Sequence, residues 1–589
     1  MSVLALLRTH MHRRGLDAYV IPSTDPHQSE YVPQHWRVLQ WASGFTGSAG
    51  TLVVTSNFAG LWTDSRYFVQ AEQQLAGSGI ELMRMRMPHT PEFVLWLSQH
   101  LPAGAVVGVD GHLLSRAWFQ QMERQLQPRG IRINTQVDLA AELWHGRPPL
   151  PNSPIWEHPL RFAGVSRIEK LSRLRQSMHE QELTHTILAS LDDIAWLLNL
   201  RGSDIEHTPL FMAYALVSLE EVMLFVDPSK IDPALKRRLH RDGVRVIPYD
   251  AWLEHVNQLP AHSTVLLDPR RVSQKLWEAL PHAVYIREGT NLTTLLKAIK
   301  TEAELQHLRQ TMIRDGVALT KFFYWLAHTV GRQRLTERTA EDKLKSLRLE
   351  QPYCQGESFN PISAYGPNAA LPHYRATPEH DTELRPEGIY LLDSGGQYLS
   401  GTTDTTRVIA LGPCSDEVRR DYTLVLKGLI AVSTLRFPVG TRGYQIDILA
   451  RLPQWQHGIN FGHGTGHGVG YFLCVHEGPQ GISPAPVDVA FQPGMISSVE
   501  PGIYRLGKHG IRLENLVCCV SAEHTEFGEF LAFETLTVAP IFTDLVEKTL
   551  LTPGERAWLR RYNQWVNRKL SRYLTSEERA WLKHVAKPI

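Results

Sequence analysis

Cysteine is scarce in this chain. The 589 residues include five cysteines, an odd number with no C-x-x-C pair: Cys354, Cys414, Cys474, Cys518 and Cys519. Two of them are adjacent in the sequence. This pattern disfavours both a disulfide framework and a thiolate zinc site, and it indicates a reducing compartment.

Long hydrophobic runs and an excess of charge are also missing. No stretch approaches the roughly 18 uninterrupted apolar residues that a membrane-spanning helix needs. The segment from Met1 to His12 lacks the apolar core of a signal peptide. Lys and Arg number 61 against 60 Asp and Glu, a formal charge of +1. The sequence therefore predicts a cytoplasmic protein with neither a nucleic-acid nor a membrane partner.

What is present is an ordinary globular composition and a weak internal repeat. Hydrophobic residues make up 43% and charged residues 21% of the chain, and its length predicts several domains. Seven features of the first copy recur in order from residue 174: Leu7-Arg8, Met11-His12, Leu16, Ser23 and Asp25 match Leu174-Arg175, Met178-His179, Leu183, Ser190 and Asp192. In each copy an amphipathic helical stretch precedes a short apolar strand, at 18–21 and 186–188. The repeat predicts duplicated α/β domains joined by the proline-rich linker 147–159.

The pattern changes near residue 300. A long helical pattern over 302–328 is followed by strands punctuated by Gly and Pro, clearest at 388–392, 495–499 and 513–520. The end, 553–585, is again helical, and its tryptophans Trp558, Trp565 and Trp581 are expected to pack as core. The predicted domains are 1–155, 156–299 and 300–589, the last with a C-terminal helical extension.

Acidic and histidine side chains accompany the apolar strands of the last domain. Asp393 and Glu500 each end an apolar run, and Glu514 lies in a third apolar segment. Asp404 follows Asp393 across a Gly- and Ser-rich turn, and His467 lies in a Gly-rich stretch. Four carboxylates in such places repel one another unless a cation compensates them. With one imidazole they form a hard-ligand set suited to manganese, iron, cobalt or zinc. Their number favours two metals about 3.5–4 Å apart.

Each of these residues alone has a simpler explanation. A single Asp at a strand end is commonly a turn or capping residue. His463, His467 or His476 alone would commonly be a surface or hydrogen-bonded core histidine. The Gly-rich stretch is not a phosphate loop, because the Lys and Ser/Thr of that motif are absent. Only the five positions together, with their order and strand contexts, favour a metal site.

Further segments along the chain carry a family resemblance. They are 25–31, 43–51 and 62–68 in the first domain, 194–204 in the second, and 358–362 and 371–374 in the third. Together with the five metal-ligand candidates, they resemble the creatinase/prolidase-like pita-bread metallopeptidases, and among these the three-domain aminopeptidase P family. The resemblance implies an α/β and α+β fold, with two related N-terminal α/β creatinase-like domains followed by a C-terminal pita-bread catalytic domain.

The resemblance also implies an activity and a substrate. The expected enzyme is a metallo-aminopeptidase that hydrolyses the bond between an N-terminal residue and a penultimate proline, using a hydroxide that bridges two divalent metals, most commonly Mn²⁺. Its partners would be peptides with proline at position 2, and the chain is expected to form a homodimer.

Individual roles follow from the same resemblance. Asp393 would chelate one ion, His467 and Glu500 the other, and Asp404 and Glu514 would bridge both. The catalytic residues would be Glu500 as general base, with His373 and His476. The substrate-binding residues would be His373, His463, His476, Phe359, Arg512 and Tyr504. The segments 360–361 and 374–376 depart from the common family pattern, which leaves the leaving-group subsite open.

Three alternatives remain at the level of the sequence. A prolidase, which cleaves Xaa-Pro dipeptides, would use the same five ligands, but prolidases of this fold usually have a single N-terminal domain. A metal-free creatinase-like amidinohydrolase is disfavoured because every ligand is retained. A non-catalytic pita-bread binding module, as in histone chaperones, typically loses ligands.

Overall fold

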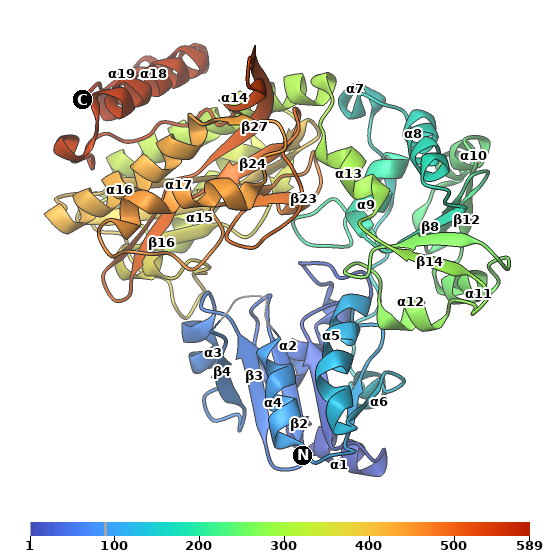
Figure 1. Ribbon diagram of the computed structural model, residues 1–589. Helices are drawn as coiled ribbons and strands as arrows, with labels where there is room; N and C mark the ends of the chain where they lie inside the picture. Colours follow the sequence, from blue (N-terminus) through green and yellow to red (C-terminus); the bar gives the residue numbers. More distant parts are fainter. Residues whose placement is uncertain (1, 87–90) are drawn as a thin grey trace. The chain divides into compact units, whose positions relative to one another are not determined.

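The computed structural model describes residues 2–86 and 91–589 and divides into two compact units (Figure 1). The first unit comprises Met1–His158 and Val165–Thr293, and the second comprises Pro159–Gly164 and Thr294–Ile589. Among the described residues, no helix combines the length and the apolar character needed to cross a membrane.

The first unit contains two sheets of six described strands each. The first sheet runs β4-β3-β2-β1-β5-β6, with β1 (Ala18–Pro22), β2 (Thr51–Thr55), β3 (Ala59–Thr63), β4 (Glu81–Arg84), β5 (Val106–Val109) and β6 (Arg132–Asn134). Its helices are α1 (Val3–Arg13), α2 (Val38–Ser43), α3 (Phe68–Gln74), α4 (Glu92–His100), α5 (Arg116–Leu126) and α6 (Leu139–Leu143).

The second sheet repeats this arrangement. It runs β12-β11-β10-β8-β13-β14, with β8 (His185–Leu188), β10 (Tyr214–Ser218), β11 (Val222–Phe225), β12 (Val244–Ile247), β13 (Thr264–Leu267) and β14 (Tyr285–Glu288). Its helices are α8 (Arg167–Glu180), α9 (Leu191–Leu198), α10 (Pro233–Arg241), α11 (Trp252–Asn257) and α12 (Gln274–Glu278), and the short strands β7 (Trp156–Glu157) and β9 (Leu200–Arg201) pair with each other. The next helix, α13 (Leu292–Ala298), begins at the end of the first unit and belongs mostly to the second.

The duplication expected from the sequence is confirmed by topology and packing. In the first sheet β1 pairs antiparallel with β2 and parallel with β5. In the second sheet the equivalent strand β8 pairs antiparallel with β10 and parallel with β13. The matched side chains Leu7 and Met11 on α1, and Leu174 and Met178 on α8, are all buried. His27 joins the two copies, since its ring nitrogens lie 2.8 Å from the carbonyl oxygen of Ala189 and 2.8 Å from the hydroxyl of Tyr249.

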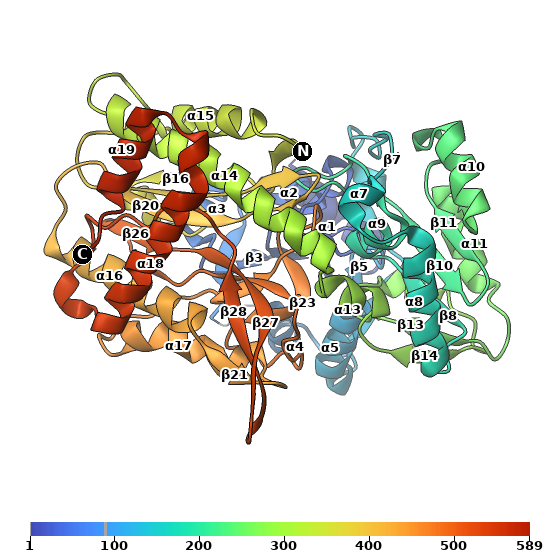
Figure 2. The ribbon, with the colours of Figure 1, turned by 90° about the horizontal axis from the view of Figure 1, so that it is seen from above.

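The second unit surrounds its sheets with helices (Figure 2). The helices are α7 (Leu160–Ala163), α14 (Glu302–Thr329), α15 (Glu337–Leu349), α16 (Asp416–Ser433), α17 (Gly443–Trp455), α18 (Pro553–Leu570) and α19 (Ser576–Val585). Two small sheets are β15-β18-β19 and β16-β17-β20, with β15 (Cys354–Glu357), β16 (Ile362–Tyr365), β17 (Ile389–Ser394), β18 (Gly396–Tyr398), β19 (Gly401–Thr402) and β20 (Thr405–Ala410). The large sheet is β21-β28-β27-β24-β22-β23, with β21 (Arg436–Pro438), β22 (Gly466–Gly468), β23 (Glu477–Ile482), β24 (Ile496–Val499), β27 (Asn515–Thr525) and β28 (Gly528–Thr535); β25 (Gly502–Arg505) pairs with β26 (His509–Arg512).

Capping explains where the long helices of this unit begin. The Thr301 side chain accepts a hydrogen bond from the backbone of Glu304, whose carboxylate accepts from Thr301 in return, and α18 and α19 begin with the same box. The helix predicted at 302–328 is therefore confirmed. Trp558, Trp565 and Trp581 pack against the hydrophobic core, as expected.

The turn predicted between Asp393 and Asp404 is more than a turn. β17 and β20 do form an antiparallel pair, but the chain between them carries β18 and β19, which form a separate small sheet with β15. Gly395 explains the tight path of this segment, because a Cβ there would lie 1.9 Å from the carbonyl oxygen of Thr403.

Candidate metal centre

Two candidate ligands come from the sheet β16-β17-β20. Asp393 lies on β17 opposite Thr406 of β20, and opposed residues of a ladder point to the same face. Asp404 precedes Thr406 by two positions and so shares that face. The register therefore directs the carboxylates of Asp393 and Asp404 to one side of the sheet.

The other three candidates come from neighbouring strands of the large sheet. His467 lies on β22, Glu500 directly follows β24, and Glu514 directly precedes β27. The ladder between β24 and β27 ends with Val499 opposite Asn515, so its next step brings Glu500 opposite Glu514.

Backbone and guanidinium contacts join the two sheets at this point. The Glu514 amide donates to the carbonyl oxygen of Thr406 at 3.2 Å. Buried Arg407 donates to the carbonyl oxygen of Glu514 at 2.5 Å. The ligand candidates therefore meet where two sheets are held together: Asp393 and His467 lie on strands, and the other three lie directly beside the ends of strands, Asp404 before β20, Glu500 after β24 and Glu514 before β27.

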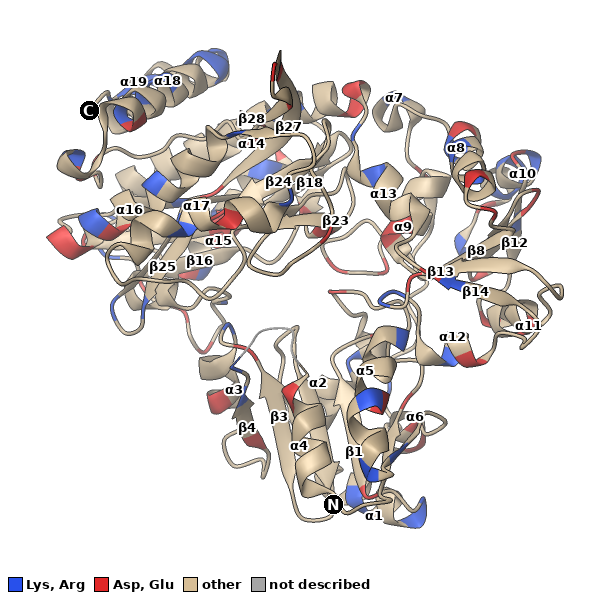
Figure 3. Cartoon of the chain, viewed as in Figure 1, with Lys and Arg blue, Asp and Glu red and all other residues tan. Residues whose placement is uncertain are grey.

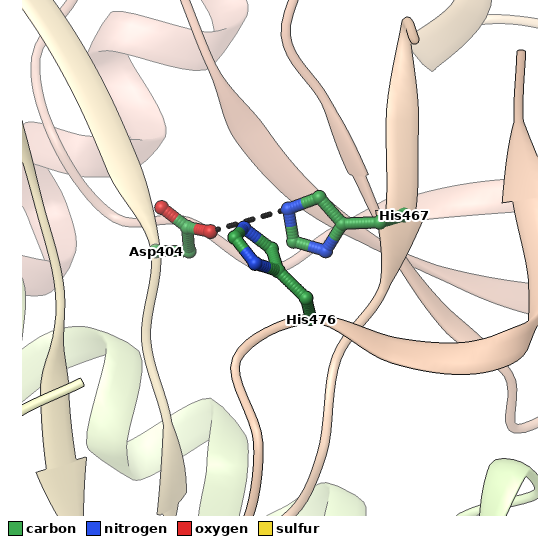
Figure 4. A group of neighbouring side chains, drawn as sticks. All are labelled: Asp404, His467 and His476. Atoms are coloured by element: carbon green, nitrogen blue, oxygen red, sulfur yellow. Dashed lines mark ion pairs between the residues drawn. The ribbon is translucent and has the colours of Figure 1, made fainter. Parts of the chain in front are cut away.

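All five candidate ligands lie within one cluster. Ligand atoms of Asp393, Asp404 and Glu514 lie within 4.8 Å of one another, and so do those of His467, Glu500 and Glu514. The set Asp404, His467 and His476 meets the same limit. Figure 4 shows this last set, with Asp404 Oδ2 and His467 Nε2 3.4 Å apart.

The His467 ring is oriented by its own backbone. Its Nδ1 lies 2.9 Å from the carbonyl oxygen of Gly468, which can only accept, so Nδ1 carries the proton. In the neutral ring Nε2 then presents a lone pair to carboxylate oxygens of Asp404, at 3.4 Å, and Glu500, at 3.5 Å. Lone pairs and carboxylates that face one another at this distance repel unless a proton or a metal cation lies between them.

Burial disfavours the ionised form of three of these carboxyl groups. Burial, with the nearby carboxylates of Asp404 and Asp393, raises the pKa of Glu514 well above its usual range. Burial also raises the pKa of Glu500 to about 7, against the opposing effect of His467. The pKa of Asp393 is likewise raised by burial, although Arg512 opposes the shift. A divalent cation would offset this cost.

One carboxylate oxygen is left for such a cation. Asp393 Oδ2 accepts from Arg512 Nη2 at 2.5 Å, whereas the buried Oδ1 has no hydrogen-bond partner among the described residues. An oxygen-rich, buried and under-compensated donor set of this kind fits hard divalent metals.

A hydrogen-bonded chain connects Asp393 to His463. Arg512 donates to the Tyr504 hydroxyl at 2.7 Å, and that hydroxyl lies 2.8 Å from Nε2 of His463. His463 Nδ1 lies 2.7 Å from the carbonyl oxygen of Gly464 and must carry the proton. Tyr504 therefore donates its own proton to Nε2. His463 is fixed in one tautomer, and the face of its ring is the surface it can offer to a substrate.

Three residues with hydroxyl side chains that the sequence analysis did not single out support the cluster. Thr406 Oγ1 donates to Glu514 at 2.9 Å and accepts from Arg512 at 3.2 Å. Ser498 Oγ accepts from the His467 amide at 3.0 Å and donates to Glu500 at 3.2 Å. The Thr465 hydroxyl donates to Asp447 at 2.7 Å, and Thr465 reaches the cluster through its carbonyl oxygen, which accepts from the Glu500 amide at 2.7 Å. Thr406 lies two positions after Asp404, but this spacing indicates a shared face only once the strand is known.

The three other predicted site residues, His476, Phe359 and His373, differ in burial and in where they lie. His476 is exposed, and its ring centroid lies 4.3 Å from that of His467. Phe359 is buried between β15 and β16. His373 lies in a turn after the 3₁₀ helix η5 (Gly366–Ala370), and η5 packs on β26, which ends in Arg512. The approach of Phe359 and His373 to the cluster stays a prediction.

Comparisons with known proteins cover the whole chain. Residues 306–521 match the model of metallopeptidase family M24, residues 4–147 and 146–304 match creatinase/prolidase N-terminal domains, and residues 529–589 match the C-terminal region of peptidase M24. Probable Xaa-Pro aminopeptidase P of Laccaria bicolor is 38% identical over 602 residues, covering 100% of this chain and 93% of the relative. The chain belongs to the Xaa-Pro aminopeptidase P proteins of metallopeptidase family M24.

Solved structures of the family agree in fold. X-prolyl aminopeptidase from Caenorhabditis elegans, described as a cytosolic enzyme with a di-nuclear active site, has a TM-score of 0.95 and 34% identity, covering 100% of this chain and 99% of its own. The Xaa-Pro dipeptidase from Bacillus anthracis has a TM-score of 0.50 and 25% identity, covering 64% of this chain and 99% of its own. The expected fold of two creatinase-like domains and a pita-bread domain is confirmed.

Proposed function

We propose that this protein is a Xaa-Pro aminopeptidase, which removes the first residue of peptides whose second residue is proline. The observation that carries the proposal is the extent of the match: the C. elegans aminopeptidase covers 100% of this chain, whereas the B. anthracis dipeptidase covers 64%. The proposal includes a cytoplasmic location and assembly as a homodimer.

We assign two divalent metals, as Mn²⁺, to the five clustered side chains. Asp393 would hold one ion, His467 and Glu500 the other, and Asp404 and Glu514 both. The assignment is supported by the grouping of the ligand atoms: Asp404 and Glu514 both lie near Asp393 in one group, and each also lies near His467 in another. When bound, such a pair of ions activates a water molecule and polarises a carbonyl group.

The side chains around the cluster supply the rest of the chemistry. Glu500 takes the proton of the attacking water, and its carboxylate is held for this role by Ser498. His476 and His373 donate to the substrate carbonyl oxygen and assist the departure of the prolyl nitrogen. The ring face of His463, with Phe359, receives the proline ring, which has no N–H to offer. Arg512 and Tyr504 orient Asp393 and His463.

A peptide panel tests the proposal. We expect Xaa-Pro-Xaa tripeptides and longer peptides to be cleaved well above Xaa-Pro dipeptides, and matched peptides with alanine at position 2 to be cleaved poorly. Chelation should abolish cleavage and Mn²⁺ should restore it, measured by mass detection of the released residue. Full activity in metal-free protein would contradict the two-metal assignment, and a preference for dipeptides would identify a prolidase.

A further inference from the structure

Two neighbouring hollows lie on the C-terminal helices, away from the metal cluster. The first, with a cavity volume of about 520 Å³, is lined by Arg561, Gln564, Asn567, Arg568, Ser571 and Lys583. The second, of about 260 Å³, is lined by Thr535, Trp558, Arg561, Tyr562 and Trp565. Arg561 of α18 belongs to both, so the two hollows form one continuous surface, which we call the α18 site.

The first hollow is basic and has no acidic lining. Residues 553–589 hold nine Lys and Arg against three Asp and Glu, in a chain whose total charge is +1. Figure 3 shows this concentration of blue on α18 and α19. Within the described residues Arg561, Arg568 and Lys583 take part in no ion pair, whereas nearby Lys427 and Lys587 pair with Glu555 and Asp544. Three cations therefore surround a hollow that holds no counter-charge.

Two side-chain amides add neutral donors to the first hollow. The Ser571 hydroxyl is not one of them, because its Oγ already donates to the carbonyl oxygen of Asn567 at 2.5 Å. The amide nitrogens of Gln564 and Asn567 donate to no described residue. Guanidinium forks and amide N–H groups together are the donors that proteins use for phosphate oxygens.

The second hollow is aromatic. Trp558 and Tyr562 are stacked at a centroid distance of 5.2 Å and an interplanar angle of 6°, and Trp565 lies 5.8 Å from Tyr562. The Tyr562 hydroxyl is committed to the carbonyl oxygens of Thr537 and Ala539 inside the protein. This hollow therefore offers ring surface rather than polar groups, and a planar ring is its natural occupant.

We propose that the α18 site binds a nucleoside diphosphate, with the phosphates on Arg561, Arg568 and Lys583 and the base against Trp558 and Trp565. An anion alone would use only the first hollow, and an uncharged ring only the second. Arg561 stands at the junction, where the ligand passes from phosphate to base. This site goes beyond the proposed peptidase activity and uses none of its residues.

Calorimetric titration of the intact protein with ADP, inorganic pyrophosphate and adenosine tests the site. We expect one ADP per chain, bound at least about tenfold more tightly than either fragment. Arg561→Ala and Arg568→Ala should each raise the Kd for ADP about tenfold or more, since each removes a charge-assisted contact. Arg560→Ala, on the same helix but outside the lining, is the matched control and should leave binding within about twofold.

A ring variant separates base recognition from charge. Trp565→Leu should weaken the binding of ADP but leave the binding of pyrophosphate unchanged. The proposal would be overturned if Arg561→Ala bound ADP as tightly as the wild type, or if the wild type bound ADP no more tightly than pyrophosphate. So would tighter binding of a single-stranded oligonucleotide than of ADP, which would indicate a general polyanion surface.

Discussion

Glu500 is the single side chain at which the proposed chemistry can be tested most directly. Glutamine is nearly isosteric and can keep the hydrogen bond from Ser498, but it cannot take a proton. We expect Glu500→Gln to lower kcat by about 10²–10⁴, the usual contribution of a general base. The measurement is kcat together with metal content by mass spectrometry. Glu534→Gln, at a surface pair with Arg309, is the control, and wild-type turnover with full metal would place the base elsewhere.

Tyr504 tests how the His463 ring is positioned. Tyr504→Phe removes both the acceptor of Arg512 and the donor to His463, and it leaves a buried guanidinium nitrogen without its partner, at a cost of about 1–3 kcal/mol. We expect KM for Xaa-Pro peptides to rise severalfold while metal content is retained.

A buried tyrosine elsewhere controls for the loss of stability. Within the part of the chain that the structure describes, the Tyr422 hydroxyl donates only to the carbonyl oxygen of Phe542, so Tyr422→Phe should lower the melting temperature without raising KM. Equal KM values in Tyr504→Phe and the wild type would show that His463 does not contribute to substrate binding through this chain.

The residues that the sequence predicted and those it missed differ in a physical way. Asp393, Glu500 and Glu514 were visible because a carboxylate at the end of an apolar strand is costly unless something compensates it. Thr406 and Ser498 were not visible, because hydroxyl side chains are common in strands. Their role depends on which strand lies opposite, and this is known only from the register.

At the scale of elements, the close approach of β22 and β24 is a second determinant of the site. A Cβ on Gly466 would lie 1.9 Å from the carbonyl oxygen of Ser498, so Gly466→Ala must push apart the strands that carry His467 and Glu500. We expect a destabilisation of about 1–3 kcal/mol and weaker metal binding.

Gly481→Ala on the adjacent strand β23 is the matched control. There the nearest atom to the added Cβ, the carbonyl oxygen of Gly466, is 3.4 Å away. Thermal unfolding with and without Mn²⁺ measures both effects. Metal-dependent stabilisation of Gly466→Ala equal to that of Gly481→Ala would show that the strand spacing does not set the ligand geometry.

Long elements were predictable from the sequence and short ones were not. The helix α14 has a capping box and a long buried face, and both leave a clear periodic pattern. The strands β18 and β19 consist largely of small and polar residues; β19 pairs with β18, and β18 pairs with β15, some forty residues earlier in the chain. Their pairing depends on a distant partner, so the segment resembled a turn.

At the scale of the whole molecule, the proposed homodimer needs an interface, and α17 offers a candidate. One face of this helix is buried through Ile446, Ala450 and Gln454. The other carries an exposed apolar stripe at helical spacing, formed by Tyr444, Ile448, Leu452 and Trp455, with Leu452 46% and Trp455 49% exposed. Contiguous exposed apolar side chains of this kind mark interaction surfaces, and a symmetric dimer would bury two copies of one stripe.

The stripe predicts which substitutions would separate the subunits. We expect the wild type to sediment as a dimer at micromolar concentration, and Ile448→Glu with Leu452→Glu to sediment as a folded monomer, because four buried carboxylates across the interface would face one another uncompensated. Leu506→Glu is the control, since Leu506 is an equally apolar side chain, 73% exposed, outside the stripe.

Beyond α17 the chain leads directly to His463 and its glycine-rich loop, which is held to the helix by Arg451 through the carbonyl oxygens of Phe461 and His463. The monomeric variant should therefore also show a raised KM. A wild-type monomer would contradict the dimer, and a double variant that remains dimeric would place the interface on another surface.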